Sequence, residues 1–278
     1  MKLLIAIGAV MLLVALFFLG ETSGTRDPVL SVYFLDVGQG DATLIESPDG
    51  TQVLIDGGPD SSVLRELGKI LGFFDRDIDM IIATHPDADH IGGLIAVLDR
   101  YTVGTIVLTQ NNSDTPAAGL FLEQVQREGA EIIDARSGQM FTFGGAELRI
   151  LFPDRDVSGL ESNTASIVSQ LVYGNTEFLF TGDSPKAIEE YLVGVYGDGL
   201  RSDVLKIGHH GSKTSTAEAF ASTVDPDYGI ISAGKDNTYG HPHQEVLDTL
   251  RSRGVETKNT AEVGSILIES DGTSVRLK

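Results

Sequence analysis

The chain contains no cysteine. This absence excludes a disulfide framework and any metal site built from thiolates, so a metal could be held here only by nitrogen and oxygen atoms. Basic residues are also few: 20 Lys and Arg stand against 40 Asp and Glu, which gives a formal net charge of −20 at pH 7. Such a surface repels polyanions at long range and argues against a protein that coats nucleic acid by counterion release. A polyanionic substrate would have to be held locally, by metal and a few cations.

Long apolar runs are absent apart from residues 3–19, which follow Lys2 and precede a polar stretch that begins at Glu21. This run lies at the lower limit for crossing a bilayer and is longer than a typical signal-peptide core of about 7–15 residues. No Ala-x-Ala cleavage pattern follows it. We expect residues 1–20 to form a hydrophobic helix that is an uncleaved membrane anchor; a cleaved signal peptide is the main alternative and a buried core helix the weaker one. Either of the first two would place the rest of the chain outside the cytoplasm, anchored to the cell membrane or secreted.

Internal repeats, low-complexity tracts and further linkers are absent beyond residue 28. We expect residues 21–28 to be a linker and residues 29–278 to form one domain with a sizeable core. The apolar patterns predict helices over 62–71, 93–100, 117–127, 185–196, 215–222 and 244–253. They predict strands over 30–35, 42–45, 53–55, 80–83, 105–108, 131–134, 148–152, 167–172, 177–180, 204–207, 228–232, 265–268 and 275–277. Because strand-only blocks are mixed with strand–helix units, this order predicts two mixed sheets covered by helices, and not a doubly wound parallel sheet.

The stretch Thr84–Gly93 carries the strongest chemical signal. Two imidazoles and two carboxylates fall within the six positions from His85 to His90, between an apolar run of strand type and a helix-like run. A polar turn between a strand and a helix holds such donor atoms on short, fixed backbone, which is typical of a metal site. The alternative is a solvated loop whose Asp residues cap the following helix. Capping would need one Asp and no histidine, so the metal site is favoured.

Polar residues also follow other predicted strands. Asp56 and Asp183 each come directly after or close to such a strand end, and all six histidines occur in three clusters, at 85–90, 209–210 and 241–243. Histidines scattered at random over a surface would not gather in this way. We therefore expect the clusters to converge on one rim of the fold.

Several motifs, taken together and in order, resemble the metallo-β-lactamase superfamily, and within it the hydrolase domain of ComEC-type DNA-uptake proteins. These motifs are Phe34–Ala42, Leu54–Gly58, Thr84–Gly93, Asn163–Ser166, Leu179–Asp183, Leu205–Ser212 and Asn237–His243, and they span nearly all of residues 30–278. Each motif alone is weak, and Gly38 and Gly40 alone could mark a simple hairpin turn. The ordered set implies an α/β or α+β four-layer αβ/βα sandwich with its site along one sheet edge.

The resemblance also implies roles for individual residues. The implied metal ligands are His85, Asp87, Asp89, His90, Asp183 and His210, with Asp183 bridging two ions. The implied catalytic residues are Asp89, His209 and His241. His209 would bind the substrate phosphate or protonate the leaving group, although which of His209 and His210 is the ligand stays open. Either His241 or His243 would reach the site while the other caps the helix over 244–253.

A further set of residues is expected in the cleft or behind the ligands: Asp36, Gln39, Asp56, Asn163, Lys206 and Ser212. Asp56 would orient a ligand imidazole. Lys206, like Lys213, is also a candidate to meet charge on a phosphate, although a lysine in a strand can equally point to solvent.

Two positions depart from the broad superfamily pattern, because Asp87 and Asn163 stand where histidines are usual. Both changes replace imidazole nitrogen by a harder oxygen ligand, which shifts that half of the site from Zn²⁺ toward Mn²⁺ or Mg²⁺. The ComEC-like branch shares both changes. We expect one or two divalent ions, with Mn²⁺ and Zn²⁺ ahead of Mg²⁺.

The sequence thus favours an exported metal-dependent hydrolase that cleaves phosphodiester bonds, foremost a nuclease acting on extracellular DNA. Two ions about 3.5–4 Å apart would activate water for direct attack on phosphorus. No Ser or Cys nucleophile constellation is evident, and Ser212 beside the His pair is a weaker candidate. Rival hypotheses are a cell-surface phosphodiesterase acting on phosphocholine or teichoic acid, a β-lactam or lactone hydrolase, and a non-catalytic partner of a DNA-uptake channel. Expected partners are DNA or another phosphodiester, the membrane through the N-terminal segment, and the DNA-uptake machinery.

Overall fold

The computed structural model describes residues 28–278 with the exception of residues 73 and 112. The predicted anchor over 1–20 and nearly all of the predicted linker over 21–28 lie outside these residues, so both stay predictions. Within the described part of the chain, no helix combines the length and the apolar character that crossing a bilayer requires.

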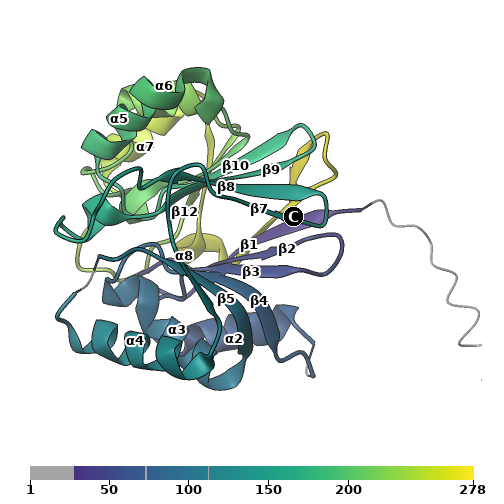
Figure 1. Ribbon diagram of the computed structural model, residues 1–278. Helices are drawn as coiled ribbons and strands as arrows, with labels where there is room; N and C mark the ends of the chain where they lie inside the picture. The colour runs from purple at the N-terminus through teal and green to yellow at the C-terminus, as the bar shows by residue number, and fades with distance from the viewer. Residues whose placement is uncertain (1–27, 73, 112) are drawn as a thin grey trace, which may run out of the picture.

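Two mixed β-sheets form the centre of the fold (Figure 1). The first has the strand order β15-β14-β1-β2-β3-β4-β5-β6 and the second the order β13-β12-β11-β10-β9-β8-β7. The strands of the first sheet are β1 (Leu30–Phe34), β2 (Thr43–Glu46), β3 (Gln52–Ile55), β4 (Asp77–Ile82), β5 (Thr102–Leu108), β6 (Glu131–Asp134), β14 (Ile266–Ser270) and β15 (Val275–Leu277). Those of the second are β7 (Met140–Phe143), β8 (Ala146–Phe152), β9 (Val168–Tyr173), β10 (Thr176–Phe180), β11 (Val204–Lys206), β12 (Tyr228–Ile231) and β13 (Glu256–Asn259).

Helices cover the outer face of each sheet. The α-helices are α2 (Ser62–Ile70), α3 (Ala88–Arg100), α4 (Pro116–Glu128), α5 (Lys186–Tyr196), α6 (Glu218–Val224), α7 (Gln244–Ser252) and α8 (Thr260–Val263), and short 3₁₀ segments are η1 (Asn163–Ala165), η2 (Gly197–Leu200) and η3 (Gly208–Gly211). Figure 1 shows α2, α3 and α4 against the first sheet and α5, α6 and α7 against the second. The predicted four-layer αβ/βα sandwich is confirmed.

Alternating side chains explain how the layers form. In β1, the side chains of Leu30, Val32 and Phe34 are fully buried while those between them are half-buried, as expected for a strand with one face on the core. Phe34 packs in the apolar layer between the sheets, 6.3 Å in ring-centroid distance from Phe180 of β10. Burial of a side chain of this size stabilises the fold by roughly 1.5–3 kcal/mol.

Some element boundaries differ from the sequence prediction. Strands β7 and β13 and helix α8 were not predicted. Both strands lie at edges of the second sheet, and β13 consists of four polar residues without an apolar signal. The prediction that a helix begins at Gly93 is wrong, because α3 begins at Ala88. Asp89 and His90 therefore lie in the first helical turn and not in a loop.

A close approach of backbones explains why α3 contains two adjacent glycines. A Cβ atom on Gly93 would lie 1.9 Å from the carbonyl oxygen of Gly57, and one on Gly92 would lie 2.1 Å from that of Pro59. Helix α3 can thus pack directly on the loop that follows β3. This contact places His90 beside Asp56, which lies in that loop.

Candidate metal centre

Strand ends from both sheets meet at one edge of the sandwich. Asp56 follows β3, Thr84 and His85 follow β4, Asp183 follows β10, and His210 follows β11. Strands β3 and β4 run parallel, as do β10 and β11, so their carboxyl ends lie at the same edge. The convergence expected from the sequence is present for these residues.

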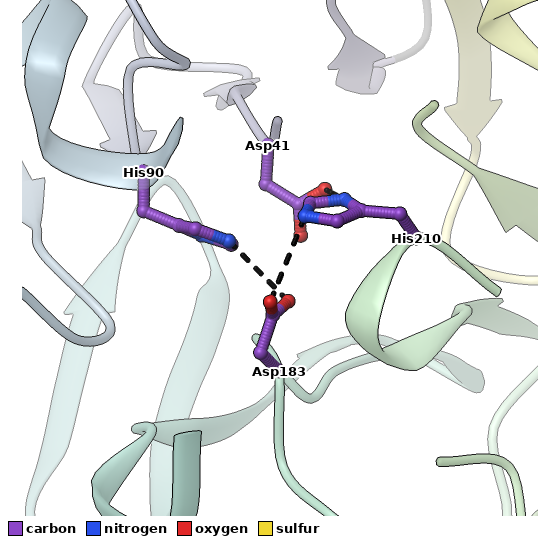
Figure 2. A group of neighbouring side chains, drawn as sticks. All are labelled: Asp41, His90, Asp183 and His210. Carbon is purple, nitrogen blue, oxygen red and sulfur yellow. Dashed lines mark hydrogen bonds and ion pairs between the residues drawn. The ribbon is translucent and has the colours of Figure 1, made fainter. Parts of the chain in front are cut away.

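Asp183 lies at the middle of the cluster. Its Oδ1 atom is 3.3 Å from His90 Nε2, and its Oδ2 atom is 3.9 Å from His85 Nε2. The same Oδ2 is 3.6 Å from His210 Nε2 and 3.5 Å from His209 Nε2. Figure 2 shows His90 and His210 directed toward the Asp183 carboxylate from opposite sides. Four imidazoles thus surround one buried carboxylate.

The ring orientation of His90 and His85 is set by hydrogen bonds at Nδ1. His90 Nδ1 lies 2.8 Å from Asp56 Oδ2, and His85 Nδ1 lies 3.0 Å from Thr84 Oγ1. The Thr84 hydroxyl donates in turn to Asp56 Oδ2 at 2.7 Å, and the Thr84 amide donates to Asp56 Oδ1 at 2.8 Å. Asp56 is therefore the shared support of both rings, which agrees with the orienting role expected for it.

His210 is held in the same way, by Asp41, for which no role was predicted from the sequence. Its Nδ1 lies 3.0 Å from Asp41 Oδ1 and 3.0 Å from the carbonyl oxygen of Ser232. The other oxygen of Asp41 accepts a hydrogen bond from Lys206 Nζ at 2.7 Å. Asp41, His90, Asp183 and His210 have ligand-type atoms within 4.8 Å of one another, but the Asp41 carboxylate is engaged by Lys206 and by the rear of the His210 ring. We assign Asp41 to the support of His210.

The three buried rings present unused nitrogens to the centre. With Nδ1 donating to an oxygen, Nε2 carries the lone pair that binds metal. The Nε2 atoms of His85, His90 and His210 are buried and have no hydrogen-bond partner among the residues described, and neither has Asp183 Oδ1. A buried polar atom left without a partner costs roughly 1–3 kcal/mol. Several such atoms facing one point fit a divalent cation.

The donor atoms divide into two groups that share Asp183. The first group contains Asp89, His90 and His210, in which Asp89 Oδ2 lies 3.3 Å from His210 Nε2. In the other, Asp87 Oδ2 lies 3.7 Å from His85 Nε2. The predicted ligands His85, Asp87, Asp89, His90, Asp183 and His210 are thus brought together, and their roles as ligands stay predictions.

The electrostatics of the cluster match this arrangement. Burial alone would raise the pKa of Asp183, but His90 and His210 outweigh it and hold that pKa well below its usual range. Burial would lower the pKa of His210, yet Asp183 and Asp41 raise it to about 9. Burial and the neighbouring His90 lower the pKa of His85 to about 3. The carboxylates draw positive charge into the centre, and a bound metal would replace the protons held there.

The His209–His210 turn has an unusual backbone. His209 has φ 49° and His210 has φ 55°, in the left-handed region that non-glycine residues rarely adopt. Each such residue costs of order 1–3 kcal/mol, and such residues cluster at functional sites. The turn is held by the amide of His209, which donates to the Gly182 carbonyl at 3.2 Å, and by the amide of His243, which donates to the Gly211 carbonyl at 2.9 Å.

An open cleft of about 170 Å³ gives access to the centre. It is lined by Gln39, Asp87, Asp89, Asp183, His209, His210, Tyr239 and His241. His241 therefore reaches the site. His243 lies at the N-terminal end of α7 as expected, although its Nδ1 accepts from the amide of Lys213 and not from the helix. His209 lies at the cleft wall with its Nδ1 3.1 Å from Thr214 Oγ1.

Four other residues expected in the cleft or behind the ligands, Lys206, Ser212, Asp36 and Asn163, are not among those that line the cleft. Lys206 is buried and directed to Asp41, so it supports the centre from behind and does not face a substrate. Ser212 is buried, and its hydroxyl accepts hydrogen bonds from Thr214. The Asp36 carboxylate accepts from the Gly38 amide at 3.3 Å. Asn163 lies in η1, and its buried Oδ1 has no partner in the part of the chain that the structure describes.

Three residues of the site were missed by sequence reasoning. Asp41 and Thr84 lie inside quoted motifs, and the signal for Asp41 was an acid directly before the apolar run that forms β2. Its partner Lys206 is 165 positions away, so the pair could not be read from local sequence. Tyr239 lies in a loop, where an aromatic residue carries no periodic signal.

The comparisons with known proteins agree with this geometry. Residues 35–235 match the family model described as the metallo-beta-lactamase superfamily. The chain is 32% identical over 252 residues to ComE operon protein 3 of Bacillus subtilis, covering 84% of this chain and 32% of that protein. It is 33% identical over 192 residues to competence protein ComA of Neisseria gonorrhoeae (69% and 25% covered) and 32% identical over 246 residues to recombination protein 2 of Haemophilus influenzae (87% and 29%). The chain thus spans about a third or less of these relatives.

Solved structures share the fold. The metallo-beta-lactamase fold protein YhfI of Bacillus subtilis superposes with a TM-score of 0.55 at 17% identity, covering 88% of this chain and 100% of that one. CmlA, a diiron beta-hydroxylase of Streptomyces venezuelae, gives 0.54 at 17% identity, with 84% and 52% covered. The predicted resemblance is confirmed: the chain belongs to the metallo-beta-lactamase superfamily, and its relatives include competence proteins of the ComEC type.

Proposed function

We propose that this protein is a metal-dependent phosphodiesterase that hydrolyses DNA outside the cytoplasm. The observation that carries the proposal is the convergence of three partnerless imidazole nitrogens on the Asp183 carboxylate, with Asp87 and Asp89 beside them. Divalent ions held there would supply a nucleophile at neutral pH and neutralise charge on a phosphate. The similarity to competence proteins supports DNA as the substrate.

The residues at the cleft have distinct tasks in this proposal. His209 lies beside the centre with its Nδ1 held by Thr214 Oγ1, so its Nε2 faces the centre, where the imidazolium form would donate a proton to a leaving oxygen or bind a phosphate oxygen. Gln39 lines the cleft, and its Oε1 accepts from the amide of Gly234 at 3.0 Å. This bond fixes the amide and leaves Nε2, which has no partner within the described residues, free to donate to a phosphate oxygen. His241 completes the wall.

The proposal extends to location and partners. We infer that residues 1–20 anchor the chain to the membrane and leave the metal centre on the extracytoplasmic side, next to DNA-uptake machinery. The apolar run over residues 3–19 and the similarity to competence proteins support this part.

A direct test uses the full 278-residue chain, freed of metal with a chelator and reloaded with Mn²⁺, Zn²⁺ or Mg²⁺. We expect Mn²⁺ to support cleavage of labelled single-stranded DNA and of bis-p-nitrophenyl phosphate. Asp183→Asn should abolish cleavage with a wild-type circular dichroism spectrum. Faster turnover of a phosphocholine ester than of DNA would favour the cell-surface phosphodiesterase instead. Absence of turnover with every ion would overturn the proposal and leave a β-lactam or lactone hydrolase or a non-catalytic partner of an uptake channel.

A further inference from the structure

Tyr239 presents an aromatic face at the mouth of the cleft. Its side chain is 66% exposed although it lines the same cleft as Asp183. The ring stacks on His241, with centroids 5.6 Å apart and an angle of 23° between the planes. The two stacked rings form one platform beside the metal centre.

The loop that carries the platform is fixed by one side chain. Asn237 Nδ2 donates to the carbonyl oxygens of Gly234 at 2.8 Å and His241 at 2.7 Å. The amide of His241 donates back to Asn237 Oδ1 at 2.9 Å. The amide of Gly234 donates in turn to Oε1 of Gln39, which lines the cleft. Because the loop is already ordered, binding on the platform would lose little conformational entropy.

Apart from a bound metal, the charges of the cleft offer little attraction for the phosphates of a nucleic acid. Of the described residues that line it, none is a lysine or arginine, while three are aspartates. The whole chain carries a formal net charge of −20. Affinity for a polyanion therefore cannot come from counterion release. Stacking of a base on an aromatic ring contributes about 1–3 kcal/mol per base and depends little on base identity.

We propose that Tyr239, stacked on His241, binds a nucleobase of a single-stranded nucleic acid and so sets the preference of the site for unpaired strands. This inference rests on the proposed function, because it specifies that the proposed DNA substrate of this site is single-stranded. Bases in a duplex are stacked on one another and cannot reach the platform. A simple phosphodiester without a base would lose this contribution.

The test compares two single-stranded oligonucleotides of equal length, one normal and one abasic at the positions flanking the scissile bond, with the Mn²⁺-loaded full chain. Tyr239→Ala should lower the ratio of kcat/KM for the normal over the abasic strand by about 5- to 150-fold, mostly through KM. Tyr239→Phe keeps the ring and should restore most of the ratio. Met140→Ala, at an exposed apolar residue of β7, is the matched control and should leave the ratio unchanged.

Binding of the same strands to the metal-free protein, followed by fluorescence anisotropy, separates this inference from the proposed function. Weaker binding of the normal strand to Tyr239→Ala supports the platform even if no variant hydrolyses DNA. An unchanged ratio in Tyr239→Ala, an equal loss with both strands, or a Tyr239→Phe variant as impaired as Tyr239→Ala would overturn the platform. Hydrolysis of DNA with any of these results would leave the proposed function standing.

Discussion

Replacing Lys206 by methionine should destabilise the protein far more than the loss of an ordinary ion pair. Lys206 Nζ lies 2.7 Å from Asp41 Oδ2 and 3.0 Å from the Ile207 carbonyl, and the two paired side chains are only 3% and 6% exposed. Methionine has a similar volume but leaves the Asp41 charge buried with one remaining partner, His210. Breaking a buried pair in this way costs about 3–5 kcal/mol. Because total stabilities are about 5–15 kcal/mol, the loss would be a large fraction.

The measurement is urea unfolding of the full chain without metal, followed by circular dichroism. The double variant Lys206→Met with Asp41→Asn removes both charges, so we expect it to recover part of the loss, and the cycle of variants gives the coupling between the two residues. Lys186→Met is the matched control, because Lys186 pairs with Glu245 at 3.0 Å on the surface with 36% and 63% exposure. Surface pairs contribute about 0–1 kcal/mol.

A cost for Lys206→Met no larger than that for Lys186→Met would refute the reasoning. It would mean that the Asp41 charge is solvated, or is neutral, when its lysine is absent. A double variant less stable than Lys206→Met would also contradict the account, because it would show that the carboxylate stabilises the fold without its partner.

Three further predictions follow from other contacts. Asp56→Asn should weaken Mn²⁺ binding about 10- to 100-fold in a competition titration with a chelating dye, because an amide supports the imidazoles less well than the carboxylate does. Asp99→Asn, on the exposed face of α3, is the control and should leave Mn²⁺ binding unchanged. Equal Mn²⁺ affinities of the Asp56→Asn and Asp99→Asn proteins would contradict the orienting role of Asp56. Gly93→Ala should lower the free energy of unfolding in urea by about 1–3 kcal/mol, because its Cβ would collide with backbone atoms. Gly119→Ala in α4, with open space around it, should raise that free energy by about 0.5–1 kcal/mol. A change of the same sign in both variants would contradict the close-packing explanation. Burial raises the pKa of Glu189 to about 7 from its ordinary value of 4.5, so its contribution to stability is complete below pH 4.5 and is lost as the pH rises through 7. Glu189→Gln should therefore flatten the plot of unfolding free energy against pH in this range. Parallel plots for the wild-type and variant proteins would refute the raised pKa of Glu189.

The sequence predicted the sandwich well because its core strands are short apolar runs that end in polar residues. The ends of β3, β4, β10 and β11 could be placed to within about two residues, and those ends carry the ligands, so the centre could be predicted too. Polar edge strands such as β13 carry no apolar signal and were missed.

The start of two helices depended on tertiary contacts. Helix α3 begins at Ala88, ahead of the glycine pair, because the neighbouring loop accepts its backbone at close range. Helix α6 begins only at Glu218, because the buried Glu189 carboxylate accepts hydrogen bonds from the amides of Thr216 and Ala217 at 2.7 Å. Neither contact can be read from the residues near the helix start.

The metal centre takes its donors from both halves of the sandwich. His85 and His90 follow a strand of the first sheet, whereas Asp183 and His210 follow strands of the second. An ion bound between them would link the two sheets. Its binding free energy would add to the stability of the folded state, because the ligands come together only when the two halves are packed. The metal supply of the surroundings would then govern how long each molecule survives proteolysis as well as how fast it works.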